Sequence, residues 1–396
     1  MNSQIPPETS FDGEEPPPHP TIRSLRELID LVSGKSLLEN ELLPPSGLAE
    51  ILPFPFMGLV GQTEMKVALL LSLINPAING VLLLGPRGTG KTTAVRSLLD
   101  LLPEIERSAC YYGCLPQDVE AGGMEAVCPD CARKYAAGLP LTISDRVRLV
   151  ELPLNARIED VVGGLDDRAI LNERLRLKRG ILAEADQNIL YVDEINLLAD
   201  DIIDATLDAA AVGKYTVHRG PVTATYNARF SLFGSMNPEE GDLRPQIMDR
   251  FGLRIIVRGL QDAAERLEAY KRVHNYTENP RQIIDHFKDE TGQARQDVQE
   301  ARRLLPHVEL PDELANTCIK VIQQLKIDSL RAEINLFEAA RAYAAADGRI
   351  KVELGDVQAV APMCLRLRRS SFITNYFQEQ TAEDLEIEAA LNSAQN

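Results

Sequence analysis

The stretch LLLGPRGTGKTTA, residues 82–94, constrains the fold of this chain more than any other feature. It continues an apolar run, residues 81–84, that is typical of a strand buried on both faces. The residues after Thr92 predict a helix that ends at Pro103, with one apolar face formed by Val95, Leu98, Leu99 and Leu102. A glycine-rich turn between strand and helix is the setting of the GxxxxGK[ST] phosphate-binding loop. The stretch therefore predicts a nucleoside triphosphate site.

Three kinds of residue in this loop suit phosphate. The glycines allow backbone angles that a Cβ would forbid, so several N–H groups can converge on one anion. Lys91 supplies a point charge for the outer phosphates, and the Thr92 hydroxyl can ligate Mg²⁺. The predicted binding residues are Gly85, Pro86, Arg87, Gly88, Thr89, Gly90, Lys91, Thr92 and Thr93.

Apolar strands alternate with helical stretches between residues 81 and 260, in the order VLLLG, VRLVELPL, NILYVD, RFSLFGSMN and LRIIVRG. This alternation predicts a parallel α/β sheet with crossover helices and a ligand at the carboxyl ends of the strands. From Asp262 onward helical patterns take over. We therefore expect a proline-rich acidic extension (1–50), a P-loop domain (51–260), an all-helical domain (261–370) and an acidic tail (371–396). Within the extension, TIRSLRELIDLVSG predicts a short helix, with a loosely held leader as the alternative.

Charge and hydropathy exclude several classes of partner. The chain has 42 Lys and Arg against 59 Asp and Glu, a formal charge of -17, which repels nucleic acid and anionic membranes at long range. Its most apolar run, residues 67–84, is interrupted by asparagines, a proline and a glycine, and so predicts helix, turn and strand rather than a membrane span. The first twenty residues lack the features of a signal peptide. We expect a cytoplasmic protein that binds neither nucleic acid nor membrane.

Two more of the predicted strands end in polar residues. NILYVDEIN places Asp193 and Glu194 at a strand tip, where Asp193 can hold the Mg²⁺ shell and Glu194 can orient and deprotonate an attacking water. Capping the next helix is the alternative role. RFSLFGSMN ends in Asn237, whose amide can position the water or the γ-phosphate, and a turn asparagine is the alternative. Glu194 predicts hydrolysis beyond binding.

Phosphoryl transfer also calls for a fixed guanidinium, which is worth about 10³ to 10⁵ in rate. Arg87 is the arginine of the loop itself, and its direction is not predictable from sequence. Arg250, in IMDRFGLRI, and Arg331, in SLRAEIN, are the other candidates. An ordinary surface salt bridge is the alternative for each.

The chain resembles the AAA+ ATPases, and within them the I subunit of magnesium chelatase and its cobalt-chelatase relatives. The resemblance covers residues 54–370 and rests on the blocks FPFMGLVGQTEMKVALLL, GPRGTGKTT, VVGGLDDRAIL, ILYVDEINLL and GSMNPEEGDLRPQIMDRFGL. It implies that Lys91 and Thr92 belong to Walker A, Asp193 and Glu194 to Walker B, and Asn237 to sensor 1. It also implies an arginine finger for the adjacent subunit at position 250 and a sensor 2 arginine in a helical lid at position 331.

The resemblance further implies ATP with Mg²⁺ as ligands and a ring, usually a hexamer. This chain would be the motor, while an H-type subunit binds the porphyrin and a D-type subunit couples the two during Mg²⁺ or Co²⁺ insertion. Residues 155–180 would be an insert in the second helix. Residues 214–227, KYTVHRGPVTATYN, would be a β-hairpin before the sensor strand. The alternatives are a MoxR-type chaperone for other metalloproteins, a DNA helicase or transcription remodeller, and a module that only senses ATP.

Four cysteines within residues 107–145 depart from that family pattern. Cys110, Cys114, Cys128 and Cys131 have the spacing C-x3-C-x13-C-x2-C, which matches the reach of a tetrahedral Cys₄ zinc site. We expect structural zinc here. A thiol switch through the last two cysteines, or unpaired cysteines that fill a loop, are the alternatives. Cys318 and Cys364 lie in helical apolar patterns and are expected in the core.

Overall fold

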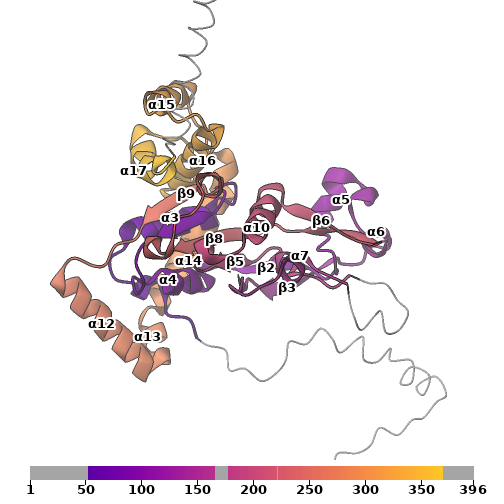
Figure 1. Ribbon diagram of the computed structural model, residues 1–396, viewed down its shortest axis with the longest axis horizontal. Coiled ribbons are helices and arrows are strands. Elements are labelled where there is room, and N and C mark those ends of the chain that lie inside the picture. The colour runs from indigo at the N-terminus through magenta and orange to yellow at the C-terminus, as the bar shows by residue number, and fades with distance from the viewer. Residues whose placement is uncertain (1–51, 166–176, 221, 369–396) are drawn as a thin grey trace, which may run out of the picture. The chain divides into compact units, whose positions relative to one another are not determined.

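A computed structural model describes residues 52–165, 177–220 and 222–368 of the chain. The predicted helix at residues 21–34, the middle of the 155–180 segment and the acidic tail lie outside these ranges. Figure 1 shows a central sheet with helices on both sides. The sheet has five strands in the order β4-β5-β8-β1-β9, and these are Leu149–Glu151, Ile189–Val192, Ser231–Met236, Val81–Leu84 and Leu253–Ile256.

All neighbouring strands of this sheet run parallel. The five apolar stretches recognised in the sequence each contribute one strand, so the predicted parallel α/β sheet is confirmed. Because the strands are parallel, their carboxyl ends lie along one edge. β8 lies between β5 and β1, and the residues that follow these three strands therefore meet.

Side chains of alternate strand residues pack into two separate cores. In β1, Val81 and Leu83 belong to one core, and Leu82 and Leu84 belong to the other. Burying such a leucine stabilises the fold by about 1.5–3 kcal/mol. The first core includes residues of α3 (Thr63–Ile74), α4 (Lys91–Ser97), α14 (Lys288–Leu304) and α16 (Leu330–Ala346). The second includes residues of α7 (Ile158–Val162), α9 (Ile181–Glu184), α10 (Asp200–Val212) and α11 (Pro245–Arg250).

The helix after the glycine loop ends earlier than the sequence predicts. α4 stops at Ser97, and a 3-10 helix, Leu98–Leu101, follows it. Since a 3-10 helix has about three residues per turn, burial follows the spacing of Val95, Leu98 and Leu101, each fully buried. Leu102, predicted on the apolar face, is only partly buried.

Two paired strands flank the segment that carries the four cysteines. β2 (Glu104–Ser108) and β3 (Thr142–Arg146) pair antiparallel and enclose α5 (Pro116–Gly122) and α6 (Pro129–Ala136). We call residues 104–146 the cysteine insert. Its two strands, EIERS and TISDR, are mostly polar and therefore lack the hydrophobic pattern by which a strand is recognised.

The predicted hairpin is confirmed. β6 (Lys214–Arg219) pairs antiparallel with β7 (Val222–Asn227), and the hydroxyls of Thr216 and Thr225 lie 2.9 Å apart across the pair. Gly220 supplies the positive φ of 56° that the turn requires. The hairpin leads directly into β8.

Helices dominate the rest of the described chain, as predicted. They are α12 (Ala263–Glu278), α13 (Pro280–His286), α14, α15 (Asp312–Gln324), α16 and α17 (Leu354–Leu365). Figure 1 shows α15, α16 and α17 grouped together. Cys318 and Cys364 are buried among them, also as predicted. Among the described residues, no helix is both long and apolar enough to cross a lipid bilayer.

Candidate nucleotide site

The glycine loop follows β1 at the carboxyl edge of the sheet. A Cβ on Gly85 would lie 2.1 Å from the carbonyl oxygen of Val257, at the end of β9, so only glycine allows this close approach. Gly88 and Gly90 have φ of 77° and 83°, in the region that other residues seldom adopt. The loop therefore has the backbone that phosphate binding requires, and α4 begins directly after it at Lys91.

The lysine of the loop is already held in place. Its Nζ donates hydrogen bonds to the carbonyl oxygens of Gly85 and Pro86, at 2.7 and 2.8 Å. Burial lowers the pKa of Lys91, and the nearby carboxylates of Asp193, Glu194 and Glu240 oppose that shift. The ammonium group thus lies between the loop and a cluster of acids, where an incoming phosphate would meet it.

Asp193 is the centre of a hydroxyl network at the tip of β5. Its carboxylate accepts hydrogen bonds from Tyr191 Oη at 2.9 Å, from Thr92 Oγ1 at 3.3 Å and from Ser235 Oγ. Thr92 Oγ1 also lies 3.0 Å from Tyr191 Oη. A threonine hydroxyl next to a carboxylate is a donor set that fits Mg²⁺. The sequence did not single out Tyr191 or Ser235, since both occupy ordinary strand positions.

Glu194 follows Asp193 in an unusual backbone conformation. Its φ is 49°, in the left-handed region, and its N–H donates to Ser235 Oγ at 3.1 Å. Non-glycine residues in this region often mark functional sites. The side chain does not cap the 3-10 helix Ile195–Leu197 that follows. It pairs instead with Arg87, whose Nη2 lies 3.0 Å from Glu194 and 2.5 Å from Glu240.

Asn237 follows β8, between the tips of β5 and β1. It is buried, and its Oδ1 accepts the N–H of Glu239 at 3.2 Å. This bond is the turn role anticipated from the sequence. The strand order also places the residue at the same edge as Lys91 and Asp193, which is the position that the sensor interpretation needs.

A pocket of ≈ 330 Å³ adjoins the loop. Its walls come from the loop itself, from the segment before α3 and from α12, and include Gly88, Thr93, Leu59, Val60 and Ala269. The pocket has the mixed apolar lining that a nucleoside requires.

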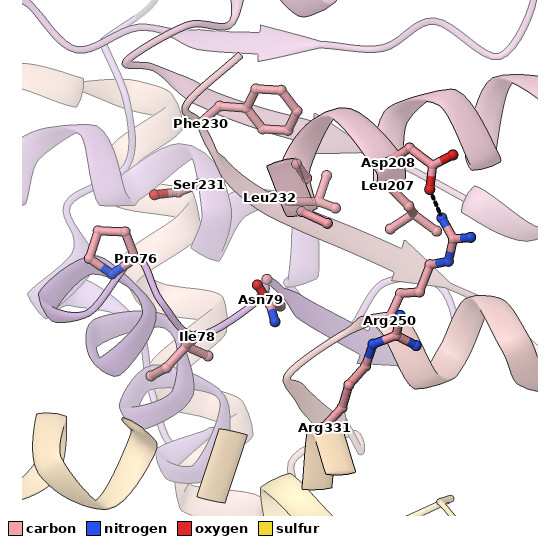
Figure 2. Close-up of a pocket in the computed structure, with 13 residues that line it drawn as sticks. Pro76, Ile78, Asn79, Leu207, Asp208, Phe230, Ser231, Leu232, Arg250 and Arg331 are labelled. Atoms are coloured by element: carbon pink, nitrogen blue, oxygen red, sulfur yellow. Dashed lines mark hydrogen bonds and ion pairs between the residues drawn. The ribbon is translucent and has the colours of Figure 1, made fainter. Parts of the chain in front are cut away.

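The other two predicted arginines lie elsewhere. Arg250, at the end of α11, pairs with Asp208 of α10 at 2.5 Å, and Arg331 of α16 pairs with Asp249 at 3.1 Å. Both line a second pocket, of ≈ 110 Å³, which contains none of the loop residues. Figure 2 shows Arg250 reaching Asp208 while Arg331 enters the same pocket. We call this the arginine pocket.

Comparison with known proteins identifies the family. The magnesium-chelatase subunit ChlI homolog of Methanocaldococcus jannaschii is 44% identical over 323 residues, which cover 81% of this chain and 87% of that protein. The chloroplastic magnesium-chelatase subunit ChlI of Glycine max is 42% identical over 318 residues, 80% of this chain and 74% of that one. The magnesium-chelatase 38 kDa subunit of Acidiphilium rubrum is 41% identical over 317 residues, 80% and 90% of the two chains. The chain belongs to the magnesium-chelatase ChlI family.

A family model and a solved structure also match parts of the chain. Residues 315–390 match the AAA lid domain family. A chain from a cryo-EM-based structure of the complex between the BchI and BchD subunits of magnesium chelatase is 39% identical, with a TM-score of 0.46 and coverage of 81% of this chain and 97% of that one. The predicted resemblance to the I subunit is confirmed.

The sequence of this ChlI-family chain does not predict the role of Asp249. This residue of α11 connects the P-loop domain to the helical region, residues 261–368. Its carboxylate pairs with Arg331 and, at 2.6 Å, with Arg368, and it accepts the Ser329 hydroxyl at 2.9 Å. Arg254 of β9 approaches it at 3.6 Å. Burial, with a contribution from Arg368, lowers the pKa of Arg254 to about 9.

The structure also brings the four cysteines of the insert together. Their sulfur atoms all lie within 4.8 Å of one another, and this is the one group of metal-ligand side chains of its kind among the described residues. Cys110, Cys114, Cys128 and Cys131 lie outside both pockets described above. The quartet thus lines neither the pocket beside the glycine loop nor the arginine pocket.

Proposed function

We propose that this chain is the ATP-hydrolysing motor subunit of a metal chelatase. The observation that carries the proposal is the meeting of Lys91, Asp193, Glu194 and Asn237 at one edge of the sheet, in a chain of the ChlI family. A loop that grips phosphate, a carboxylate for Mg²⁺ and a second carboxylate for water are the parts that ATP hydrolysis needs. The comparisons do not favour the MoxR-type alternative.

In this proposal the loop residues bind the triphosphate. Residues 85–93 surround the phosphates, and Lys91 exchanges its carbonyl partners for phosphate oxygens. Thr92 and Asp193 would hold the Mg²⁺ ion, which would neutralise charge on the phosphates. Glu194 orients and deprotonates the attacking water, and Asn237 positions the water or the γ-phosphate.

The arginine pocket serves a neighbouring subunit in the same proposal. Arg250 and Arg331 line a pocket that contains no residue of the glycine loop, and we propose that they act on the nucleotide bound by another copy of the chain. A head-to-tail contact of this kind generates a ring when the rotation closes. We propose a homo-oligomeric ring, most simply a hexamer.

The ring would act together with two partner subunits. A relative at 39% identity is recorded in complex with a BchD subunit, which supports a D-type partner for this chain. An H-type subunit would hold the tetrapyrrole into which the metal is inserted. The family name favours Mg²⁺ as the inserted ion, and Co²⁺ is the second candidate.

Lys91→Ala tests the proposal. We expect ATP binding to fall at least ~10²-fold because the variant lacks the charge that faces the phosphates. Metal insertion in a mixture with D-type and H-type subunits should stop, as measured by the absorption change of the porphyrin with Mg²⁺ or Co²⁺. Insertion at the wild-type rate by Lys91→Ala would refute the motor role. Lys320→Ala removes an exposed lysine of α15 instead; it is the matched control and should bind ATP normally.

A further inference from the structure

The cysteine quartet has the geometry of a closed metal site. Cys110 Sγ lies 3.7 Å from Cys114 Sγ and 3.5 Å from Cys128 Sγ. Tetrahedral zinc has Zn–S bonds of about 2.3 Å, which place its sulfur ligands about 3.8 Å apart. A disulfide requires about 2.05 Å. The observed separations therefore match ligands around one ion and are too long for a bonded pair.

The surroundings of the sulfur atoms also fit thiolate ligands. The N–H of Tyr112 donates to Cys110 Sγ at 3.2 Å, and the N–H of Cys128 donates to Cys114 Sγ at 3.3 Å. Hydrogen bonds from backbone N–H groups to ligand atoms hold those ligands in the orientation that a metal needs. Cys114 and Cys131 are buried and the other two are half-buried. Four cysteine ligands would fill a tetrahedral site, without the open position that a catalytic zinc keeps.

The cysteine insert has little other means of holding its shape. Apart from the cysteines, its buried apolar residues are Leu115, Val119, Val127 and Leu141. The insert also has two short helices and a mostly polar ladder. Small units with so little apolar core commonly depend on a metal or disulfides.

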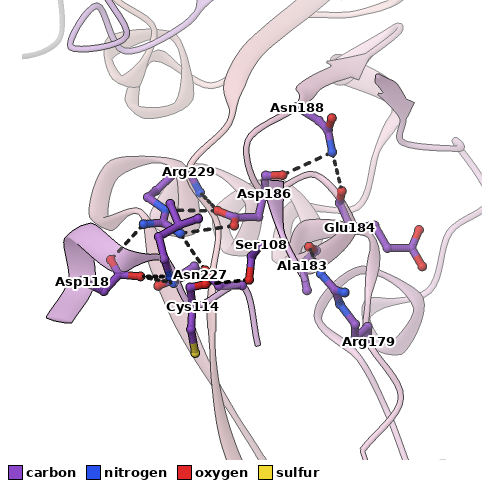
Figure 3. Close-up of polar contacts among 12 residues, drawn as sticks. Ser108, Cys114, Asp118, Arg179, Ala183, Glu184, Asp186, Asn188, Asn227 and Arg229 are labelled. Carbon is purple, nitrogen blue, oxygen red and sulfur yellow. Dashed lines mark hydrogen bonds and ion pairs between the residues drawn. The ribbon is translucent and has the colours of Figure 1, made fainter. Parts of the chain in front are cut away.

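The same loop that carries the first two cysteines contacts the β6–β7 hairpin. The carbonyl oxygen of Gly113 accepts hydrogen bonds from Asn227 Nδ2 and Arg229 Nη2, both at 2.9 Å. Arg229 also pairs with Asp118 of the insert at 3.0 Å and with the buried Asp186 at 3.3 Å. Figure 3 shows Arg229 between these two carboxylates, with Asn227 beside it. The rings of Tyr112 and Tyr226 stack with centroids 5.6 Å apart.

We propose that Cys110, Cys114, Cys128 and Cys131 bind one structural Zn²⁺ ion, and that this ion fixes the insert against the β6–β7 hairpin. The hairpin leads into β8, and Asn237 follows β8, so the metal would hold the part of the chain that precedes the sensor strand. This proposal does not depend on the chelatase function.

Metal analysis of the full-length chain, expressed with zinc in the medium and purified without added metal, tests the site. We expect one equivalent of zinc, released by a mercurial reagent, and visible absorption of a tetrahedral thiolate when Co²⁺ replaces it. Cys128→Ser/Cys131→Ser should lose the metal, while Cys318→Ala, outside the quartet, should keep it. Less than about half an equivalent of zinc in the wild type, iron in its place, or a disulfide between any two of the four cysteines would overturn the zinc assignment.

Hydrogen exchange tests the structural role. Removing zinc from the wild-type chain should speed amide exchange in residues 110–118 and 222–227 by at least ~10-fold, because both sides of the contact lose their support. Exchange in α16 should not change, since that helix belongs to another core. If exchange in the hairpin is unaffected while zinc leaves, the ion does not fix the hairpin and that part of the proposal fails. Because this measurement uses no substitution, it does not depend on whether a variant folds.

Discussion

The phosphate-loop edge and the arginine pocket hold their charged groups in different ways. At the edge, Lys91 bonds to two backbone carbonyl groups of the loop, and Asp193 accepts three hydroxyls, from β5, β8 and α4. In the pocket, Arg250 and Arg331 each pair with one carboxylate and are 30% and 52% exposed. The edge thus holds its charged groups rigidly where a ligand from solvent can bind. In the pocket, each arginine could leave its carboxylate partner and bind another anion.

From this difference we propose that each region supplies half of a hydrolytic site. The glycine loop at this edge has an arginine, Arg87, but its guanidinium group pairs with Glu194 and Glu240. The arginine pocket has guanidinium groups and no residue of the glycine loop. Phosphoryl transfer needs both parts. We therefore expect hydrolysis to require an edge from one subunit and a pocket from the next.

The largest expected effect comes from Arg250→Ala. Loss of the guanidinium should lower kcat for ATP hydrolysis by about 10³-fold or more, because it would stabilise charge only in the transition state. ATP affinity of the chain's own loop should change by less than about threefold. Phosphate release and binding of a fluorescent ATP analogue measure the two quantities. A variant that loses affinity and rate together would contradict the two-region comparison.

Mixing variants sharpens the same prediction. Equal amounts of Arg250→Ala and Lys91→Ala chains should recover activity, since about a quarter of the randomly formed contacts would join an intact loop to an intact arginine. The control pairs Arg250→Ala with the double variant Lys91→Ala/Arg250→Ala, a mixture in which every Arg250 is missing. Recovery in the control, or none in the first mixture, would show that Arg250 does not act across a subunit contact.

A second effect should come from the edge alone. Glu194→Gln keeps the size of the side chain but removes the base, so kcat should fall by about 10²–10⁴-fold while ATP still binds. Unlike Arg250→Ala, this variant should gain nothing from mixing with Lys91→Ala, because the base must stand in the same subunit as the loop. Nucleotide binding and phosphate release on the mixed assemblies measure this. If mixing with Lys91→Ala restored the activity of Glu194→Gln, the base would act on ATP bound by another subunit, and the prediction would be wrong.

The comparison also shows what the sequence can predict. The edge was predictable because buried parallel strands are continuous apolar runs, and a polar residue that ends such a run stands out. Asp193, Glu194 and Asn237 all carry that signal, and the strand order brings them together as expected. The glycine loop adds a spacing that depends only on local backbone geometry.

Polar contacts between distant segments were not predictable. Asp249 pairs with arginines 82 and 119 positions further along the chain, and Arg87 reaches Glu194 across 107 positions. Such contacts produce no periodicity and involve residue types that are common on surfaces. The ladder of β2 and β3 was missed for a related reason, since its polar strands pair across the whole insert. In the parts of the structure that the sequence does not predict, hydrogen bonds and ion pairs rather than apolar burial determine the conformation.

The smallest expected effect concerns Asp249, which ties the arginine pocket to the helical region. Asp249→Asn should slow hydrolysis by about 10-fold, equivalent to about 1.4 kcal/mol, because Arg331 loses its anchor. It should also lower the free energy of unfolding by about 2–3 kcal/mol, since the buried Arg368 loses its counter-charge. Phosphate release and urea unfolding measure the two effects. The matched control is Asp208→Asn, whose exposed pair with Arg250 should contribute less than about 1 kcal/mol.

The pH dependence of the unfolding free energy distinguishes the effect of the Asp249 charge from the effect of its packing. Burial by itself would raise the pKa of Asp249, but Arg368, the Ser329 hydroxyl and Arg331 outweigh it, so the pKa lies below its ordinary value. A lowered carboxyl pKa stabilises the fold fully above the unfolded value of about 4, and this stabilisation is lost as the pH falls through the folded pKa. The difference in unfolding free energy between wild type and Asp249→Asn should therefore be largest near neutral pH and shrink in acid. A difference that stays constant down to about pH 3 would mean that Asp249 acts through packing and hydrogen bonds, and not through its charge.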